Sequence, residues 1–500
     1  MRTIAFLIMS GLFVSATLRA EAITEADLLK HIEILASDGF EGREPGTLGE
    51  NKTVHYIATQ WSRAGLRPAG EKGSWYAPVA LVERTPVTAD IIFGSPDRRT
   101  ALRLRREETI LRSRDAFFQQ ANVPVVFAGY AQGGAGQEQT AVEGKLVILP
   151  QTVPGDADDS AGFRQRKTQL IEAGALAIIS VVADQGRWMR SLRRYQRGAT
   201  GLGDADNHAA VEGLISFNQF RRLLQPTGLA AENLLAHSAD TGIIDLGWSA
   251  DVTVDTKVRR YVSHNVVAKI SGRKADSGAL LFLGHWDHFG ICRAEDPLEP
   301  GQDRICNGAI DNASGISLLI ETAKRLSGGD LDRDIYFLAT TAEEKGLLGA
   351  RAFVRNPPVA LDRFQAVFNA DTIALSDDRT NIAVIGLQES GLGKDIGVVA
   401  QQQGREIDRS GYSDAYLKRQ DGYVFVERDI PALMITSAFA DEAKVTAYLD
   451  GPYHDVSDEV NEALVLSGAA ADANFHVALG RYFGSTATYP GKATSGGADN

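Results

Sequence analysis

Five residues in the second half of the chain are of types that bind metal ions: His285, Asp311, Glu344, Asp371 and His454. Two histidines and three carboxylates suit zinc, and a carboxylate such as Asp311 has two oxygens with which it can bridge two ions. Two metal ions held close together can bind a hydroxide and polarise a carbonyl group at the same time. The set therefore makes the chain a candidate hydrolase with two metal ions.

Two neighbouring acidic residues could assist this chemistry. Glu343 stands beside a candidate ligand, and it could be the general base that takes a proton from the bound water and returns it to the leaving amine. Asp287 comes shortly after His285 and could accept the other N–H of that imidazole, which would fix the orientation of the ring. His288 has no matching ligand role, and we expect it to support a ligand or the fold.

The candidate ligands follow apolar runs that predict buried strands. These runs span residues 279–284, 335–339, 366–370 and 430–435. Runs that are apolar without alternation are typical of parallel strands covered on both faces. Residues 314–326 have apolar side chains at helical spacing. The alternation predicts an α/β fold with a doubly wound, mixed and mainly parallel sheet flanked by helices, in which ligands bind beyond the carboxyl ends of the strands.

Each candidate ligand taken alone has an ordinary structural explanation. A single histidine or aspartate at a strand end is more often a loop or capping residue, and Asp311 could cap the helix that begins near Ser314. Glu343 and Glu344 alone could be a solvated pair in a loop. Their joint occurrence on a parallel-sheet pattern favours a metal site instead.

The motifs around these residues resemble the zinc aminopeptidase family called M28. The similar segments are His285-Trp286-Asp287-His288, residues 307–315, residues 343–349, Asn369-Ala370-Asp371, Tyr453-His454, and an opening helix with a glycine-rich turn at residues 35–47. The resemblance implies that His285 and Asp371 bind one Zn2+ and that Glu344 and His454 bind the other. It further implies that Asp311 bridges the two Zn2+ ions and that Glu343 is the base.

The resemblance also implies a zinc-peptidase fold that is interrupted by an insertion. Short strands at 123–130, 144–149 and 174–180 around a helix at 163–173 look like the β-rich protease-associated domain that many family members carry there. Such a domain would influence which peptides enter. The expected organisation is a signal peptide at 1–22, the N-terminal part of the peptidase domain at 23–109, the protease-associated insertion at 110–248, the zinc peptidase domain at 249–485 and a disordered tail at 486–500.

One departure from the family pattern concerns the substrate pocket. Many members have Ser-Asp-His followed by Phe, whereas this chain has Gln420-Asp421-Gly422-Tyr423-Val424-Phe425. Asp421 and Phe425 match, and with Tyr453 they are the expected substrate-binding residues. The same stretch could be a strand-and-turn feature that does not contact the substrate.

The only two cysteines, Cys292 and Cys306, lie between His285 and Asp311. In an exported chain an isolated pair at this spacing favours a disulfide, with two free buried thiols as the alternative. A bridge would stiffen the loop that carries Asp311.

The N-terminus has the pattern of a secretory signal peptide. Arg2 supplies a positive charge, residues 4–14 are apolar, and Ala20-Glu21-Ala22 offers a cleavage site that gives a mature start near Ile23. A cut after Ala20, or a buried first helix, is the alternative. No later apolar stretch approaches the length of a membrane span. We expect an exported protein, periplasmic or secreted, with no membrane span.

The composition limits the classes of function. With 500 residues, of which 44% are hydrophobic and 23% charged, the chain can bury a large core and should form more than one domain. The formal net charge of −12 argues against a nucleic-acid partner.

The sequence as a whole predicts an aminopeptidase that acts on peptides with a free N-terminus. A carboxypeptidase for acidic C-terminal residues should gather arginines near the motifs, and none cluster there. A glutaminyl cyclase with one zinc ion is a second alternative. A non-catalytic binding protein should have gaps among the ligands, and there are none. The same ligands accept manganese or cobalt, so the native metal stays open, as do the preferred N-terminal residue and the oligomeric state.

Overall fold

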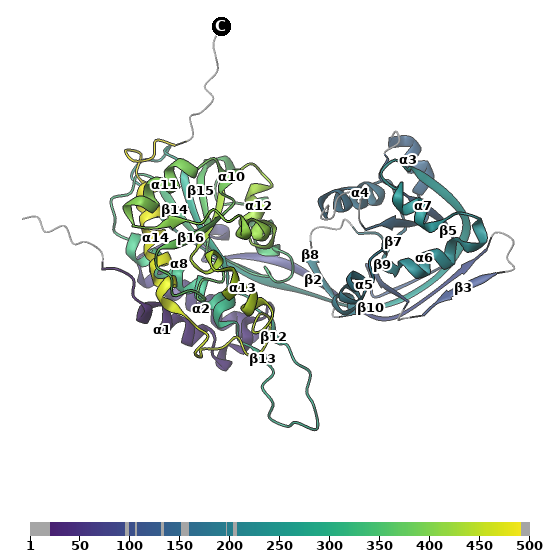
Figure 1. Cartoon of the computed structure of the whole chain (residues 1–500), viewed down its shortest axis with the longest axis horizontal. Helices are drawn as coiled ribbons and strands as arrows, with labels where there is room; N and C mark the ends of the chain where they lie inside the picture. The colour runs from purple at the N-terminus through teal and green to yellow at the C-terminus, as the bar shows by residue number, and fades with distance from the viewer. Residues whose placement is uncertain are drawn as a thin grey trace, which may run out of the picture. The chain divides into compact units, whose positions relative to one another are not determined.

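A computed structural model describes residues 21–491, apart from 96–99, 106–107, 132–134, 152–159, 197 and 204–207. The chain divides into two compact units, and the long strand β10 (Ile243–Ile270) contributes residues to both (Figure 1). The first unit consists of the chain up to Ala77, Asn265–Thr341, and the chain from Phe353 onward. The second unit consists of Pro78–His264 and Ala342–Ala352.

The sheet of the first unit is mixed and mainly parallel, as the apolar runs predicted. Its strands lie in the order β17 (Glu406–Ile407), β16 (Asn381–Ile385), β18 (Ala432–Thr436), β15 (Phe364–Asn369), β11 (Ala279–His285), β14 (Asp334–Thr340) and β10 (Ile243–Ile270). The central strands β18, β15, β11 and β14 are parallel, whereas β16 runs antiparallel to β18 and the last part of β10 runs antiparallel to β14. The short β1 (Arg67–Pro68) also pairs with β10.

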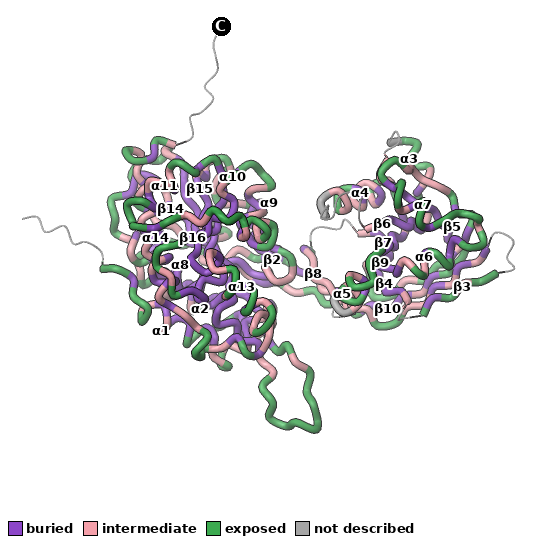
Figure 2. Tube along the Cα trace, in the orientation of Figure 1, coloured by how far each residue is buried: buried purple, intermediate pink, exposed green. Residues whose placement is uncertain are grey.

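The centre of this sheet is a layer of aromatic rings. Phe282 of β11 lies between Phe337 of β14 and Phe368 of β15, with ring centroids 5.4 and 5.2 Å apart. The three side chains are fully buried, and such pairs add to the free energy gained by burying apolar area. Figure 2 shows the strands as the buried interior of the unit.

Helices pack against this sheet. The predicted helix at 314–326 is present as α8 (Ser314–Leu326), which packs beside α14 (Leu466–Gly484) against β11 and β14. The opening segment forms α1 (Glu25–Leu35) and α2 (Leu48–Arg63), and both contact α8. Thr24 and Thr47 cap these two helices, each accepting a hydrogen bond from a backbone N–H of the first turn. The other α-helices that lie wholly within the described part of this unit are α10 (Leu387–Ser390), α11 (Gly393–Gln402), α12 (Tyr423–Val426) and α13 (Glu442–Leu449).

The strands of the second unit are also paired in a mixed arrangement. Their order is β10, β5 (Phe117–Ala128), β6 (Leu146–Pro150), β7 (Ala177–Val182), β9 (Val211–Ser216) and β4 (Thr109–Ser113), with β5, β6, β7 and β9 parallel. A further strand, β2 (Tyr76–Gly94), pairs with β3 (Ala101–Leu104) and β8 (Ala199–Leu202). The helices are α3 (Ala135–Val142), α4 (Ser160–Glu172), α5 (Gln185–Gln196), α6 (Phe217–Leu224) and α7 (Ala231–Ala236).

The second unit contains the elements expected for the insertion. The strands predicted at 123–130, 144–149 and 174–180 correspond to β5, β6 and β7, and the helix predicted at 163–173 corresponds to α4. The predicted insertion at 110–248 lies within the range 78–264 of this unit. Its identity as a protease-associated domain stays a prediction.

The prediction of a disordered tail is wrong for residues 486–491. The N–H of Thr486 donates to Asp332 Oδ2 at 2.9 Å, and Arg333 donates to the carbonyl oxygen of Tyr489 at 2.8 Å. The ring of Tyr489 is buried against Phe483. The prediction rested on the average composition of the tail, which is low in apolar residues, and did not consider the single aromatic residue Tyr489. Residues 492–500 lie outside the described residues.

Most of the predicted signal peptide, residues 1–20, also lies outside the described residues. Within the part of the chain that the structure describes, no helix combines the length and the apolar character needed to cross a membrane.

Candidate metal centre

Three parallel strands bring the candidate ligands to one edge of the sheet. In the register of the first unit, His285 at the end of β11 is paired with Thr340 at the end of β14. Leu283 of β11 is paired with Asn369 at the end of β15. Parallel strands share one carboxyl edge, so the residues that follow β15 emerge beside His285. This explains why Asp371 lies close to that histidine.

His285, Asp311 and Asp371 form a buried group whose ligand atoms all lie within 4.8 Å of one another. The Nε2 atom of His285 is 3.2 Å from Oδ1 of Asp311 and 3.5 Å from Oδ1 of Asp371. The three side chains are at most about a tenth exposed. Two buried carboxylates this close together repel each other unless a positive charge lies between them. The arrangement therefore fits a metal cation.

Asp311 also faces the second histidine. Its Oδ2 atom is 3.4 Å from Nε2 of His454, so its two oxygens point to different imidazoles. Burial raises the pKa of Asp311, but hydrogen bonds with His285 and His454 outweigh it and hold the pKa well below its usual value. A carboxylate with one oxygen toward each of two ligands has the geometry needed to bridge two ions. The donor set of imidazoles and carboxylates suits zinc.

The backbone around Asp311 is held by the next residue, Asn312. Its side-chain amide donates to the carbonyl oxygen of Ala370 at 3.0 Å and to that of His285 at 3.3 Å. Its Oδ1 accepts hydrogen bonds from the backbone N–H groups of Thr372 and Gly315. Asn312 therefore ties together the segments that carry His285, Asp311 and Asp371. Its residue type alone did not indicate this role, although Asn312 belongs to the motif at 307–315.

Asp287 supports His285 in a way that differs from the prediction. The Nδ1 atom of His285 is 3.1 Å from the backbone carbonyl oxygen of Asp287 and 3.8 Å from its side-chain Oδ1. The carbonyl is therefore the closer acceptor, and it favours a proton on Nδ1 and a free lone pair on Nε2. The backbone thus provides the nearer partner, and the role of the Asp287 carboxylate stays a prediction. His288 lies edge-on to His454, with ring centroids 5.8 Å apart.

Glu343 and Glu344 follow β14 closely, but they lie in the segment Ala342–Ala352, which belongs to the second unit. The carbonyl oxygen of Glu343 accepts hydrogen bonds from the N–H groups of Gly346 and Leu347, which form a tight turn. Ala342 and Leu348 are buried on either side of this turn. The roles of Glu343 as base and of Glu344 as ligand stay predictions.

The three expected substrate-binding residues have different environments. Tyr453 is half-buried, and its ring stacks on that of His454 with centroids 3.6 Å apart. Asp421 is buried and accepts a hydrogen bond from the hydroxyl of Thr340. Phe425 is 0% exposed and packs on Phe353 in the interior. The roles of Asp421, Phe425 and Tyr453 in substrate binding stay predictions.

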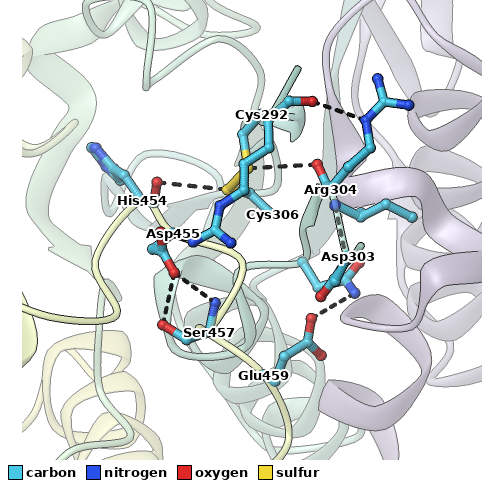
Figure 3. Close-up of a disulfide and its surroundings, with 11 residues drawn as sticks. Cys292, Asp303, Arg304, Cys306, His454, Asp455, Ser457 and Glu459 are labelled. Carbon is cyan, nitrogen blue, oxygen red and sulfur yellow. Dashed lines mark hydrogen bonds and ion pairs between the residues drawn. A yellow bond between two sulfur atoms is a disulfide. The ribbon is translucent and has the colours of Figure 1, made fainter. Parts of the chain in front are cut away.

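The predicted disulfide between Cys292 and Cys306 is present, with Cα atoms 5.7 Å apart. It closes the loop between β12 (Gly290–Ile291) and β13 (Ile305–Cys306) (Figure 3). The Sγ atom of Cys306 is 3.5 Å from the carbonyl oxygen of His454. Arg293 forms an ion pair with Asp455 across 2.6 Å. The bridge therefore anchors a loop that touches the segment carrying His454.

Arg43 is a buried residue whose role was not predicted from the sequence. Its guanidinium donates to the carbonyl oxygens of Trp286, Asn307 and Gly308 at 2.8, 2.5 and 2.9 Å. It also donates to the carbonyl oxygen of Leu35. The side chain thus joins the opening segment to the loops that carry His285 and Asp311. The only signal in the sequence was the place of Arg43 in the glycine-rich turn at 35–47.

Comparison with known proteins also indicates a metallopeptidase. Residues 265–478 match the model of peptidase family M28. The chain is 37% identical over 75 residues to aminopeptidase YwaD of Bacillus subtilis, which is 15% of this chain and 16% of that protein. It is 28% identical over 191 residues to a probable zinc metalloprotease of Pyricularia oryzae, which is 35% of this chain and 37% of that protein. The chain thus spans well under half the length of these curated relatives.

A solved structure has a similar fold over most of the chain. It is the aminopeptidase from Aneurinibacillus sp. strain AM-1, with a TM-score of 0.54 and 17% identity over 92% of this chain and 94% of that one. At this identity the likeness concerns the fold alone. The stretch that carries all five candidate ligands, residues 265–478, thus matches peptidase family M28, within a chain folded like a solved aminopeptidase.

Proposed function

We propose that the protein is an exported aminopeptidase with two zinc ions that hydrolyses the N-terminal residue from peptides. The observation that carries the proposal is the position of Asp311, whose two oxygens face His285 and His454 separately. The match to peptidase family M28 covers all five candidate ligands and supports the same reaction class. The disulfide supports export, because structural disulfides persist in oxidising compartments.

We assign the ligands as the resemblance implies. His285 and Asp371 would hold one zinc ion, Glu344 and His454 the other, and Asp311 both. When bound, the two ions would polarise the scissile carbonyl group and make a water molecule acidic enough to attack it. The backbone carbonyl of Asp287 keeps the proton of His285 on Nδ1, so that Nε2 is free to act as a donor atom.

Glu343 would move the proton in this reaction. As general base it would accept a proton from the attacking water, and as general acid it would then deliver that proton to the nitrogen of the leaving amine. The water forms the new bond to the carbonyl carbon, and the C–N bond of the peptide breaks. Residues 110–248, as a protease-associated domain, would influence which peptides reach this chemistry.

The test is to measure metal content and peptide cleavage in one purified sample. The substrates are dipeptides with free and N-acetylated termini, N-terminal glutamine peptides, and peptides with acidic C-terminal residues. About two zinc ions per chain and cleavage of free amines only would support the proposal. Cleavage of the N-acetylated series from the C-terminus would indicate a carboxypeptidase, and release of ammonia from N-terminal glutamine would indicate a cyclase. Zinc without turnover on any substrate would favour a binding protein.

A further inference from the structure

Asp458 is a fully buried carboxylate that the assigned reaction does not use. Its Oδ1 accepts a hydrogen bond from the backbone N–H of Ile310 at 2.9 Å, and its Oδ2 accepts one from the N–H of Asp311 at 3.1 Å. The hydroxyl of Tyr448 also donates to Oδ2, at 2.9 Å. One side chain thus holds two successive amides, the second of which belongs to the candidate bridging ligand.

The backbone of Asp458 adds a further connection to the same segment. Its carbonyl oxygen accepts a hydrogen bond from the N–H of Ala309 at 3.1 Å. Three consecutive amides, at residues 309–311, are therefore bonded to one residue. Asp458 lies in the same loop as His454, shortly after it in the sequence. These hydrogen bonds therefore join the loop that carries Asp311 to the loop that carries His454.

The arrangement needs a carboxylate. Two N–H donors that approach the two oxygens of one side chain require both oxygens to be acceptors. An asparagine in this place would offer one acceptor and would direct an N–H toward the other donor. Hydrogen bonds to an ionised acceptor are also shorter and stronger than bonds between neutral groups.

We propose that Asp458 is a positioning residue that fixes Asp311 relative to His454 and thereby sets the affinity of the site for its metal ions. The proposal rests on the proposed function, because it takes both residues to be ligands. A displacement of Asp311 moves its Oδ1 away from His285 and its Oδ2 away from His454 together. Loss of a group that orients ligands in this way typically costs 10–100-fold in metal affinity or activity.

The test compares Asp458→Asn with Asp472→Asn. Asp472 is an equally buried aspartate that accepts hydrogen bonds from the N–H and hydroxyl of Ser437 and from Arg405. It lies on α14, and no described contact joins it to a candidate ligand. Both variants remove one buried negative charge, so their comparison separates a loss of stability from an effect on the site.

The readouts are the number and affinity of bound Zn2+, the visible absorption of the Co2+ form, and kcat. We expect Asp458→Asn to lower metal affinity by about 10–100-fold and to change the Co2+ spectrum. We expect Asp472→Asn to unfold at a lower temperature while it keeps the affinity and spectrum of the wild type. Wild-type affinity and an unchanged spectrum in Asp458→Asn would overturn the proposal.

If Asp458→Asn does not fold, Tyr448→Phe tests the same contact by removing only the hydroxyl that orients Oδ2. A several-fold loss of metal affinity supports the positioning role, and wild-type affinity overturns it. Metal binding and peptide cleavage by the wild type distinguish a failure of the proposed function from a failure of the positioning role. If it binds metal but cleaves no peptide, the proposed function fails and the affinities still decide the role of Asp458. If it is an active peptidase and the variants match its affinity, only the positioning role fails.

Discussion

The Nε2 atom of His285 lies 3.2 Å from Oδ1 of Asp311, at the carboxyl edge of the parallel strands. The other oxygen of that carboxylate faces His454. A residue that only capped a helix would turn its oxygens toward backbone N–H groups. The observed directions therefore favour a metal ligand over a cap for Asp311.

Removing the proposed bridging ligand should weaken the binding of both zinc ions. Removing a ligand of a single ion should weaken the binding of that ion only. We expect Asp311→Ala to retain less than one zinc ion per chain and His454→Ala to retain about one, as measured by elemental analysis after dialysis. The exposed His237, changed to alanine, is the control and should leave two. Equal loss of zinc in both site variants would contradict the role of Asp311 as the bridge.

The proposed base can be separated from its neighbouring ligand. We expect Glu343→Gln to keep both metal ions and to lower kcat by about 10²–10⁴-fold, because the amide cannot accept the proton of the attacking water. We expect Glu344→Gln to lose zinc as well as activity. Metal content and steady-state kinetics on the same preparations check both outcomes. Substantial turnover by Glu343→Gln would rule out the assigned mechanism.

The disulfide should contribute to stability. It closes a loop with a sequence separation of 14, for which the loop-entropy relation gives about 3 kcal/mol. We expect replacement of both cysteines by serine to lower Tm by roughly 6–12 °C, as measured by calorimetry. A reducing agent should cause a similar shift in the wild type and none in the double variant. An unchanged Tm in the double variant would show that the bridge does not stabilise the unit.

A buried histidine should make stability depend on pH. Burial lowers the pKa of His476 from its usual value of 6.5 to about 4, because the charged ring would lose its hydration. Unfolding therefore takes up a proton between these two values. The resulting stability is fully present above about pH 6.5 and is lost as the pH falls toward 4.

Urea denaturation between about pH 7 and pH 5 measures this contribution. We expect the free energy of unfolding of the wild type to fall by roughly 2 kcal/mol over that range, since each pKa unit corresponds to about 1.4 kcal/mol. His476→Phe removes the titrating group and should flatten the curve. The ring is 0% exposed and lies near Phe282, so phenylalanine suits the site. The same slope in both proteins would mean that another group titrates.

Residue patterns alone predicted several strands and the central helix of the first unit. Residues 279–284 and 335–339 are apolar without alternation, and only a strand buried on both faces accommodates such runs at that length. The helix at 314–326 was predicted with its observed bounds, because its apolar spacing follows the helical period. The candidate ligands could also be identified from the sequence, since the apolar runs and motifs around them are local patterns.

The features that no residue pattern predicted depend on contacts between segments that are distant in the sequence. Three side chains hold the candidate site through hydrogen bonds to backbone groups of other segments: Asn312, Arg43 and Asp458. Every residue type offers such backbone groups, so these partners cannot be predicted from the sequence. The nearer partner of His285 is a carbonyl oxygen rather than the carboxylate of Asp287 for the same reason. Burial of Phe425 and Tyr489 likewise depends on which surfaces meet. Local residue patterns thus specify the strands and helices. Packing between segments that are distant in the sequence specifies how the side chains of the candidate site are held.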